Sequence, residues 1–279
     1  MVYHEKAYAK VNLGLRVLNK RDDGFHPLKT IFHKIDLYDE ILININESNE
    51  TRVLITGNEE YINGGVDLME KAALLFSRFA NKNFEIKINI KKNLPFQAGL
   101  GGGSSDAATV LLTLNKHFNN ILNNDDIMVL GLSLGSDVPF FLTGFDAAYG
   151  EGRGEILKEV ESVNYPAVIL KKNSDKVSTK EAFRLLDERK EVCDTFPSWP
   201  LEINKWQAEL INDFDIIQNI RKEDEFKLLA KKARYNTTSG SGSCQLLVFS
   251  TEEEVNEFLK VPSSYLMLTT KLKSSLHKN

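Results

Sequence analysis

Residues 95–106 read PFQAGLGGGSSD, and this glycine-rich stretch decides the interpretation of the whole chain. A run of alternating apolar residues precedes it, which predicts a strand, and a helix with one apolar stripe follows it. Glycine allows the backbone to turn sharply and to approach a ligand closely, and the free N–H groups at a helix start attract anions. The stretch therefore predicts a phosphate-binding loop, with Ser104 or Ser105 capping the helix and helping to position a magnesium ion.

Two other glycine-rich loops do not fit this stretch. A Walker A loop requires Gly-Lys-Ser/Thr, and no lysine is present here. A dinucleotide-binding fingerprint requires a glycine at its last position, where this chain has Ser104. A flexible linker is the remaining alternative, but a strand before the loop and a well-patterned helix after it argue against a linker.

Composition limits the class of protein. The chain has 279 residues, is 42% hydrophobic and carries a net charge of -4, so one large domain or two ordinary domains can bury a core. The mild acidity argues against a general nucleic-acid binder but not against a small anionic substrate. Cys193 and Cys244 are too scattered for a disulfide scaffold or a zinc site, and we expect both to be ordinary small apolar residues. Without an apolar leader or a run of about 18 apolar residues, a soluble cytoplasmic protein is expected.

Hydrophobic periodicity predicts a mixture of strands and helices. In the first half we expect strands at 7–17, 30–37, 41–45, 52–56 and 84–90, helices at 68–79, 107–118 and 125–132, and a glycine-rich loop at 144–154. In the second half we expect strands at 167–170, 245–249 and 265–269 and helices at 179–186, 206–214, 224–232 and 251–259. This pattern predicts a mixed α/β domain over 1–155 and a smaller α+β domain over 156–279.

Two charged residues lie in apolar surroundings. Lys10 shares one face of the first strand with Asn12, which fits either a solvated sheet face or a cleft-facing lysine that stabilises a deprotonating hydroxyl. Asp137 stands beside the apolar run 138–141, where it either caps a helix or acts as a general base.

Two further segments have both a plain and a functional interpretation. Phe25 and His26 leave an Asp-Asp turn at 21–24, where a lone histidine is usually structural or exposed, although the pair can also bind a flat ring. Residues 239–243 read SGSGS directly before a strand. They form either an ordinary loop or a second loop that closes over the phosphates.

Together these segments resemble the GHMP family of small-molecule kinases. The resemblance extends from residue 7 to residue 243 through three motifs, at 7–13 with 21–26, at 95–108 and at 239–243, and the segment 135–140 is similar to the family's catalytic aspartate segment. It implies a two-domain GHMP kinase fold, with an N-terminal domain like domain 2 of ribosomal protein S5 and a C-terminal ferredoxin-like α+β domain. It also implies ATP and Mg²⁺ as cofactors and phosphoryl transfer to a small alcohol.

Within the family, residues 10–13, 23–26 and 177–183 look most similar to the branch that phosphorylates the 2-hydroxyl of 4-diphosphocytidyl-2-C-methyl-D-erythritol in non-mevalonate isoprenoid synthesis. The resemblance then implies that Lys10 and Asp137 are catalytic. It implies substrate contacts by Asn12, Phe25, His26, Thr179 and Phe183, with the cytosine ring held by Phe25, His26 and Phe183. It implies nucleotide contacts by Pro95, Gly99, Leu100, Gly101, Gly102, Gly103, Ser104 and Ser105, and a closing loop of Ser239, Gly240, Ser241 and Gly242. Magnesium is expected to arrive with ATP and to contact Ser105, without a protein ligand set of its own.

Some positions depart from the family pattern. Phe25 stands where a tyrosine is frequent, and Asp67 stands where an asparagine often contacts adenine. Residues 190–218 match weakly, and no role is assigned to them. Two alternatives remain: a GHMP kinase acting on homoserine or mevalonate, which the segment 24–26 disfavours, and a non-catalytic nucleotide-binding protein. Retention of both Lys10 and Asp137 disfavours the second alternative, because binding alone needs neither.

Overall fold

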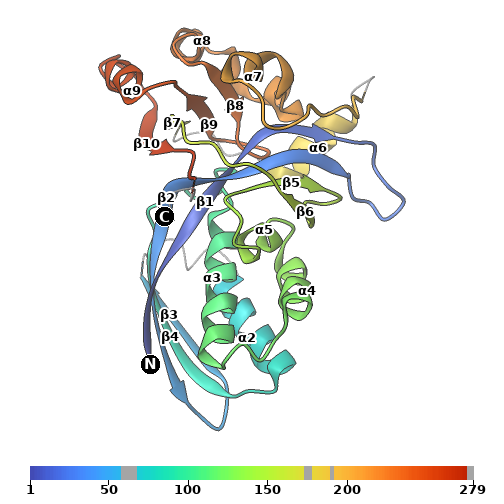
Figure 1. Ribbon diagram of the computed structural model, residues 1–279, viewed down its shortest axis with the longest axis vertical. Coiled ribbons are helices and arrows are strands. Elements are labelled where there is room, and N and C mark those ends of the chain that lie inside the picture. Colours follow the sequence, from blue (N-terminus) through green and yellow to red (C-terminus); the bar gives the residue numbers. More distant parts are fainter. Residues whose placement is uncertain (58–67, 173–177, 189–191, 275–279) are drawn as a thin grey trace. The chain divides into compact units, whose positions relative to one another are not determined.

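The computed structural model describes residues 1–57, 68–172, 178–188 and 192–274 (Figure 1). Contacts divide the chain into two compact units, a first unit of Met1–Ala9, Leu37–Phe96 and Gly101–Phe145, and a second unit of Lys10–Asp36, Gln97–Leu100 and Asp146–Asn279. These units differ from the predicted domains, because the strands β1 (Val2–Val17) and β2 (Leu28–Glu47) each contribute residues to both. The boundary near residue 155 therefore stays a prediction.

The first unit packs helices against a sheet. Strand β3 (Arg52–Gly57) is parallel to β4 (Phe84–Lys91), and β4 is antiparallel to the last residues of β2. The alternation predicted along β4 is confirmed, because its four apolar residues from Phe84 to Ile90 are buried. Figure 1 shows α2 (Leu68–Ala80) and α3 (Gly102–His117) beside β3 and β4, and the helices α4 (Asn124–Leu134) and α5 (Val138–Leu142) follow them in the chain. Rings of Phe76 and Phe84 both pack on Phe118, with centroids 5.9 and 5.7 Å from it.

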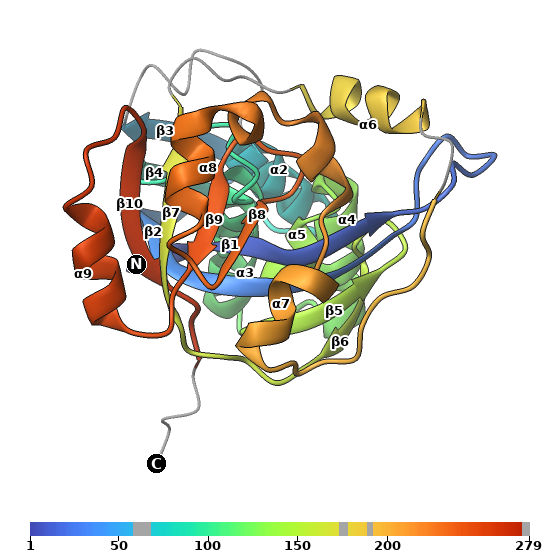
Figure 2. The same ribbon diagram turned by 90° about the horizontal axis from the view of Figure 1, so that it is seen from above.

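The second unit contains an antiparallel sheet in the order β10–β7–β9–β8 (Figure 2). Its strands are β7 (Pro166–Lys171), β8 (Tyr235–Thr238), β9 (Gln245–Val248) and β10 (Leu266–Lys271). Alternate residues of β7, including Val168 and Leu170, pack with Leu247 of β9 against helices α8 (Asp224–Ala230) and α9 (Glu252–Leu259). The strands predicted at 167–170 and 245–249 are confirmed, and the structure buries both along their length, from Pro166 to Leu170 and from Gln245 to Val248.

The expected loop at 144–154 is wrong in part, because β5 (Ala147–Glu151) occupies its centre. This strand pairs with the first residues of β2 and with β6 (Ile156–Glu159). Gly150 looked like a turn residue, but a Cβ added there would lie 2.6 Å from the Phe32 ring. The glycine thus makes room for a side chain on the paired strand rather than a turn.

Shorter helices complete the second unit: α6 (Thr179–Asp187), α7 (Ile203–Glu209) and the 3₁₀ helices η1 (Asp213–Ile217) and η2 (Asn219–Lys222). The predicted continuous helix at 206–214 is wrong. The chain leaves helical geometry at Leu210, and Ile211 O accepts a hydrogen bond of 3.0 Å from the backbone N–H of Leu15 in β1. The hydrogen bond between Ile211 and strand β1 therefore replaces the bonding that a continued helix would make.

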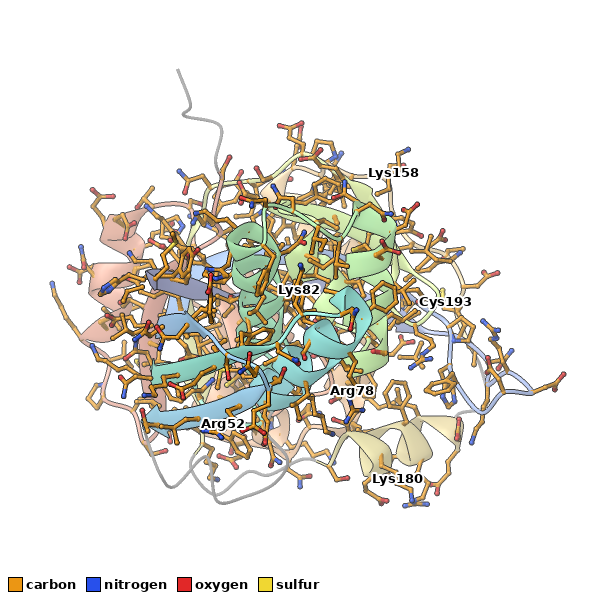
Figure 3. The ribbon with its side chains drawn as sticks, turned by 90° about the horizontal axis from the view of Figure 1, so that it is seen from below. Arg52, Arg78, Lys82, Lys158, Lys180 and Cys193 are labelled. Atoms are coloured by element: carbon orange, nitrogen blue, oxygen red, sulfur yellow. The ribbon has the colours of Figure 1, made fainter. Side chains whose placement is uncertain are left out.

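The two cysteines differ in environment. Cys244 is buried, as expected, but Cys193 is exposed and lies 3.0 Å from the Thr195 hydroxyl (Figure 3). The expectation of an ordinary apolar residue is therefore wrong for Cys193. Among the described residues, no helix combines the length and the apolar character that a membrane crossing requires.

Candidate active site

The end of the glycine-rich loop is the start of α3, in the first unit. The helix begins at Gly102, and its N-cap is Gly101, whose φ of 71° places it in the left-handed region. The N-cap makes no side-chain hydrogen bond, and the serines lie within the first turn, where Ser105 N donates to Gly101 O at 2.9 Å. The predicted capping by Ser104 or Ser105 is therefore wrong, because a left-handed glycine starts the helix with backbone groups alone.

Gly103 is exposed in this first turn, and no residue that the structure describes requires a glycine there. A Cβ added at Gly103 would meet only the Leu68 side chain at 3.8 Å, which is an ordinary contact, and its φ is not in the left-handed region. A side chain at this position would instead cover N–H groups at the start of a 16-residue helix. The open backbone fits the close approach of phosphate oxygens, as a nucleotide site needs.

A buried ion cluster that the sequence did not indicate holds both ends of this region. The Lys92 ammonium lies 2.5 Å from Asp39 and 2.7 Å from Asp106, which belongs to the first turns of α3. Asp39 also accepts hydrogen bonds from the backbone N–H groups of Asn93 and Leu94, at 2.6 and 2.8 Å. Burial lowers the pKa of Lys92, but the carboxylates of Asp106 and Asp39 outweigh it and raise that pKa overall. The cluster therefore ties the chain that enters the loop to the helix that leaves it.

Asp137 lies in the same unit, immediately before α5. It occupies the N-cap position of that helix, with φ −84° and ψ −18°, but its side chain makes no capping hydrogen bond. The alternative of a plain helix cap is therefore wrong. Helix α5 packs against α3, and a Cβ added at Gly135 would lie 4.0 Å from the Ser104 hydroxyl. The segment that carries Asp137 thus borders the helix start that fits phosphate.

Lys10 and Asn12 belong to the second unit, and both are buried. Lys10 is 2% exposed, and its ammonium donates to Asn12 Oδ1 at 2.8 Å. Asn12 Nδ2 donates to the Thr30 hydroxyl at 2.9 Å, and Gly240 N donates to Asn12 Oδ1 at 3.0 Å. The alternative of a solvated sheet face is therefore wrong. Asn12 links the first motif to the third.

The third motif also bonds to the first residues of the glycine-rich loop, again within the second unit. The Ser239 hydroxyl donates to Gly99 O at 2.9 Å, and Cys244 N donates to Ala98 O at 3.2 Å. Gly99 has a φ of 77°, and a Cβ added there would lie 2.0 Å from Ser239 O. Pro95 is half-buried before this segment, whereas Leu100 is buried and its carbonyl accepts from Lys10 N at 2.9 Å. Glycine at position 99 is thus a requirement of the protein itself.

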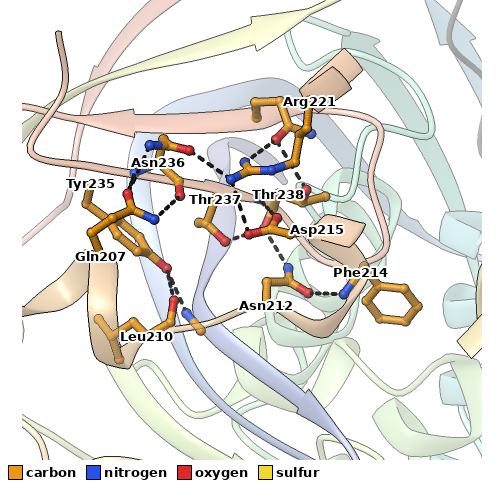
Figure 4. A network of polar contacts seen from close by, with 12 residues as sticks. Gln207, Leu210, Asn212, Phe214, Asp215, Arg221, Tyr235, Asn236, Thr237 and Thr238 are labelled. Carbon is orange, nitrogen blue, oxygen red and sulfur yellow. Dashed lines mark hydrogen bonds and ion pairs between the residues drawn. The ribbon is translucent and has the colours of Figure 1, made fainter. Parts of the chain in front are cut away.

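Residues 212–221, to which the sequence assigned no role, support the closing loop (Figure 4). Asn212 Nδ2 donates to Thr238 O at 2.7 Å and to Gly240 O at 3.0 Å. Gln218 Nε2 donates to Ser241 O at 2.9 Å, and a Cβ on Gly242 would lie 2.6 Å from the Gln218 side chain. The loop is therefore held by side-chain amides on both of its sides.

A charged pair lies behind these amides. Asp215 accepts from Thr238 N at 2.8 Å, and the Arg221 guanidinium lies 3.4 Å from its other oxygen. Burial raises the pKa of Asp215, although Arg221 acts in the opposite direction. Arg221 also donates to Gln245 at 2.9 Å and to Asn236 at 2.8 Å, which ties η2 to β8 and β9 (Figure 4).

The residues expected to bind cytosine fall into two groups, both in the second unit. The His26 and Phe183 rings stack, with centroids 5.1 Å apart and planes at 28°, and Thr179 Oγ1 lies 3.2 Å from the Ser241 hydroxyl. Phe25 is 45% exposed, and its ring packs against the Arg153 guanidinium at 3.8 Å. The structure thus brings His26 to Phe183 and Thr179 to the closing loop, while Phe25 pairs with Arg153. Asp67 and Val177 lie outside the described residues.

Comparisons with known proteins agree with this architecture. Residues 67–145 match the family model for the GHMP kinases N terminal domain. A solved structure described as 4-(cytidine 5'-diphospho)-2C-methyl-D-erythritol kinase superposes with a TM-score of 0.77 at 29% identity, covering 98% of this chain and 100% of that one. A mevalonate kinase from Methanococcus jannaschii superposes with a TM-score of 0.63 at 14% identity, covering 98% of each chain, which shows the fold alone. Fold and glycine-rich loop together define a GHMP-type small-molecule kinase.

Curated relatives narrow this class. The 4-diphosphocytidyl-2-C-methyl-D-erythritol kinase of Ruthia magnifica is 36% identical over 95% of this chain and 93% of its own length. The enzyme of the same name from Geobacter metallireducens is 37% identical over 89% of this chain and 90% of its own length. The chain belongs to the family of 4-diphosphocytidyl-2-C-methyl-D-erythritol kinases. It is an ATP-dependent small-molecule kinase, and the predicted GHMP fold with mixed α/β content is confirmed.

Proposed function

We propose that this chain transfers the terminal phosphate of ATP to the 2-hydroxyl of 4-diphosphocytidyl-2-C-methyl-D-erythritol, a step of non-mevalonate isoprenoid synthesis. The observation that carries the choice of acceptor is the stack of His26 on Phe183. These two side chains come from distant parts of the sequence, and a planar cytosine ring would stack on Phe183 beside His26, with its edge toward the imidazole. Homoserine and mevalonate carry no such ring, so the stack favours the cytidine-bearing acceptor over theirs.

Phosphoryl transfer depends mainly on positioning and on neutralising charge, and the proposed roles follow that requirement. Asp137 accepts or orients the proton of the acceptor hydroxyl. Lys10 stabilises the alkoxide that develops, with its ammonium oriented by Asn12 at 2.8 Å. The N–H groups around Gly103 hold the phosphates, and the closing loop 239–242 supports the segment at Gly99.

Magnesium completes this proposal. Serine hydroxyls are hard oxygen donors of the kind that Mg²⁺ accepts beside phosphates, and Ser104 and Ser105 stand in the first turn of α3. Ser104 is partly exposed, whereas Ser105 is buried. The ion, brought by ATP, would neutralise phosphate charge, and Ser105 together with its neighbour Ser104 would contact it.

An ADP-release assay tests the function directly. We expect ADP release to require 4-diphosphocytidyl-2-C-methyl-D-erythritol and to stop when EDTA removes Mg²⁺. Homoserine and mevalonate, tested in parallel, should give no release above background. ATP binding without release on any acceptor would instead favour a non-catalytic nucleotide-binding protein.

Replacement of the proposed base tests the mechanism. Asp137→Asn removes the carboxylate that accepts the proton, so kcat should fall on the order of 10²-fold or more at saturating substrate. The substitution removes no capping hydrogen bond from α5. Wild-type turnover by this variant would show that the assignment of the base is wrong.

Truncation of the aromatic pair tests the acceptor site. His26→Ala and Phe183→Ala should each raise KM for the cytidine-bearing acceptor about tenfold, because base stacking on Phe183 contributes roughly 1–3 kcal/mol and a hydrogen bond to His26 about 1 kcal/mol. KM for ATP should stay within about twofold. Equal increases of both KM values would contradict the cytosine assignment.

A further inference from the structure

We propose that Asp187 is a positioning residue that fixes the orientation and the proton location of the His26 ring, and through it the discrimination of cytosine from other bases. Asp187 was not among the site residues predicted from the sequence. The inference rests on the proposed function, because it takes His26 to face the base of the acceptor. It goes beyond that function by naming a side chain that need not touch the substrate.

The His26 ring is held on two of its sides by α6. Its Nε2 lies 2.5 Å from Asp187 Oδ1, and its face stacks on Phe183 with centroids 5.1 Å apart. The His26 side chain is 8% exposed, whereas Asp187 is 39% exposed. One contact fixes the plane of the imidazole, and the other fixes the rotation of the ring within that plane. A flip of the ring would lose the short hydrogen bond to the carboxylate.

Helix spacing explains why both contacts come from one element. Thr179, Phe183 and Asp187 follow one another at intervals of four residues, so they lie along one face of α6. The neighbouring stripe of α6, Ala182 and Leu186, is buried in a cluster with Phe214. Because that stripe is packed, the helix cannot rotate about its axis without losing apolar contacts. The face that meets His26 and the closing loop is thereby fixed.

The carboxylate also determines where the imidazole carries its proton. Two lone pairs cannot share a hydrogen bond, so Nε2 must carry a hydrogen to approach a carboxylate oxygen at 2.5 Å. In the neutral ring, Nδ1 is then a hydrogen-bond acceptor. Cytosine carries an amino donor where uracil carries a carbonyl acceptor. A ring nitrogen whose proton is placed by Asp187 can distinguish these two edges, whereas a ring free to change tautomer cannot.

Kinetics of Asp187 variants test the inference. Asp187→Ala should raise KM for the cytidine-bearing acceptor about tenfold, because the His26 ring loses the hydrogen bond to a charged group that orients it. The preference in kcat/KM for this acceptor over its uridine-diphosphate analogue should fall about tenfold, while KM for ATP stays within about twofold. Asp187→Asn retains a carbonyl acceptor and should recover most of the preference.

The next residue offers a matched control. Glu188 is also exposed at the end of α6 and pairs with Arg184 at 2.6 Å rather than with His26. Glu188→Gln removes the same negative charge from the same helix and should leave both KM values unchanged. An equal loss of acceptor preference in Glu188→Gln would assign the effect to surface charge and overturn the inference.

A spectroscopic readout separates this inference from the proposed function. In ¹⁵N-histidine-labelled protein, the His26 signals should report hydrogen on Nε2 in the wild type and a mixture of tautomers in Asp187→Ala. Unchanged tautomers in the variant, or changed tautomers with an unchanged acceptor preference, would overturn the inference. A wild-type enzyme that does not use the cytidine-bearing acceptor would instead contradict the proposed function, and the spectra would still test the Asp187–His26 contact.

Discussion

The two ends of the glycine-rich loop contain the same residue type for opposite reasons. At Gly99, in the second unit, φ is 77° and an added Cβ would lie 2.0 Å from Ser239 O. At Gly103, in the first unit, no described side chain or backbone atom would lie closer to an added Cβ than the Leu68 side chain at 3.8 Å. The protein needs the first glycine to fold around the third motif. The second glycine is exposed at a helix start, where the missing side chain leaves the backbone N–H groups open to a ligand.

Glycines of one motif can therefore serve different purposes, one in the fold and another in ligand binding. Substitutions along the loop should separate into those that damage the fold and those that damage nucleotide binding. The comparison is testable because the same change, glycine to alanine, can be made at both ends and measured in both ways.

Gly99→Ala should have the largest effect. The variant combines a left-handed backbone with a clash against a backbone carbonyl, so the free energy of unfolding should fall by about 3 kcal/mol or more, as measured by urea denaturation. Gly24→Ala is the matched control, because Gly24 has a φ of 84° but no atom of the described residues lies within 4 Å of an added Cβ. Backbone strain alone should reduce stability there by about 1–2 kcal/mol. Equal losses in the two variants would refute packing against Ser239 as the reason for Gly99.

Gly103→Ala should rank second and should affect a different quantity. A methyl group at the phosphate site should reduce kcat/KM for ATP about tenfold, which corresponds to about 1.4 kcal/mol. The free energy of unfolding should stay the same or rise by about 0.5–1 kcal/mol, because alanine favours the helix over glycine. Steady-state kinetics and urea denaturation on one preparation check both parts. A less stable Gly103→Ala variant with normal kinetics would show that the fold, and not the nucleotide, requires this glycine.

Ser239→Ala should have the smallest effect. It removes the 2.9 Å hydrogen bond from the Ser239 hydroxyl to Gly99 O but leaves both backbones in place. A neutral hydrogen bond contributes about 1 kcal/mol, so the free energy of unfolding should fall by roughly that amount. Nucleotide KM should change less than it does in Gly103→Ala. A larger kinetic effect at Ser239 would mean that the closing loop acts on phosphates directly rather than through Gly99.

Elements with clear periodicity were predictable from the sequence. The alternation from Phe84 to Ile90 gave β4, because it records which face of the strand is buried. The helical spacing from Leu68 to Phe79 gave α2, although only Ala72 and Phe76 of that stripe are buried and Phe79 is 49% exposed. Strand β8 was missed because its sequence, YNTT, is short and mostly polar although three of its four residues are buried. Its polar groups are satisfied by partners such as Asp215, which lie far away in the sequence.

The candidate site likewise contains residues that were predictable from the sequence and residues that were not. The three motifs, and the expectation that His26 and Phe183 contact one ring, followed from local residue types and from the family resemblance. The supporting side chains Asn212 and Gln218 did not, because their role is to donate to backbone carbonyls that any sequence possesses. Asp187 carried a weak signal in its four-residue spacing from Phe183, but that spacing has meaning only once the partner of Phe183 is known.

The interleaving of the two units has a consequence for synthesis on the ribosome. Gly14 N donates to the Tyr235 hydroxyl across 221 residues, and the Lys10–Asp36 segment belongs to the unit that Asp146–Asn279 completes. At the roughly 5–20 residues per second of translation, the nascent N-terminal strands wait on the order of 10–40 seconds for these partners. The apolar face of β1 therefore emerges long before the groups that bury it. Nascent chains of this kinase should depend on chaperone protection during that interval.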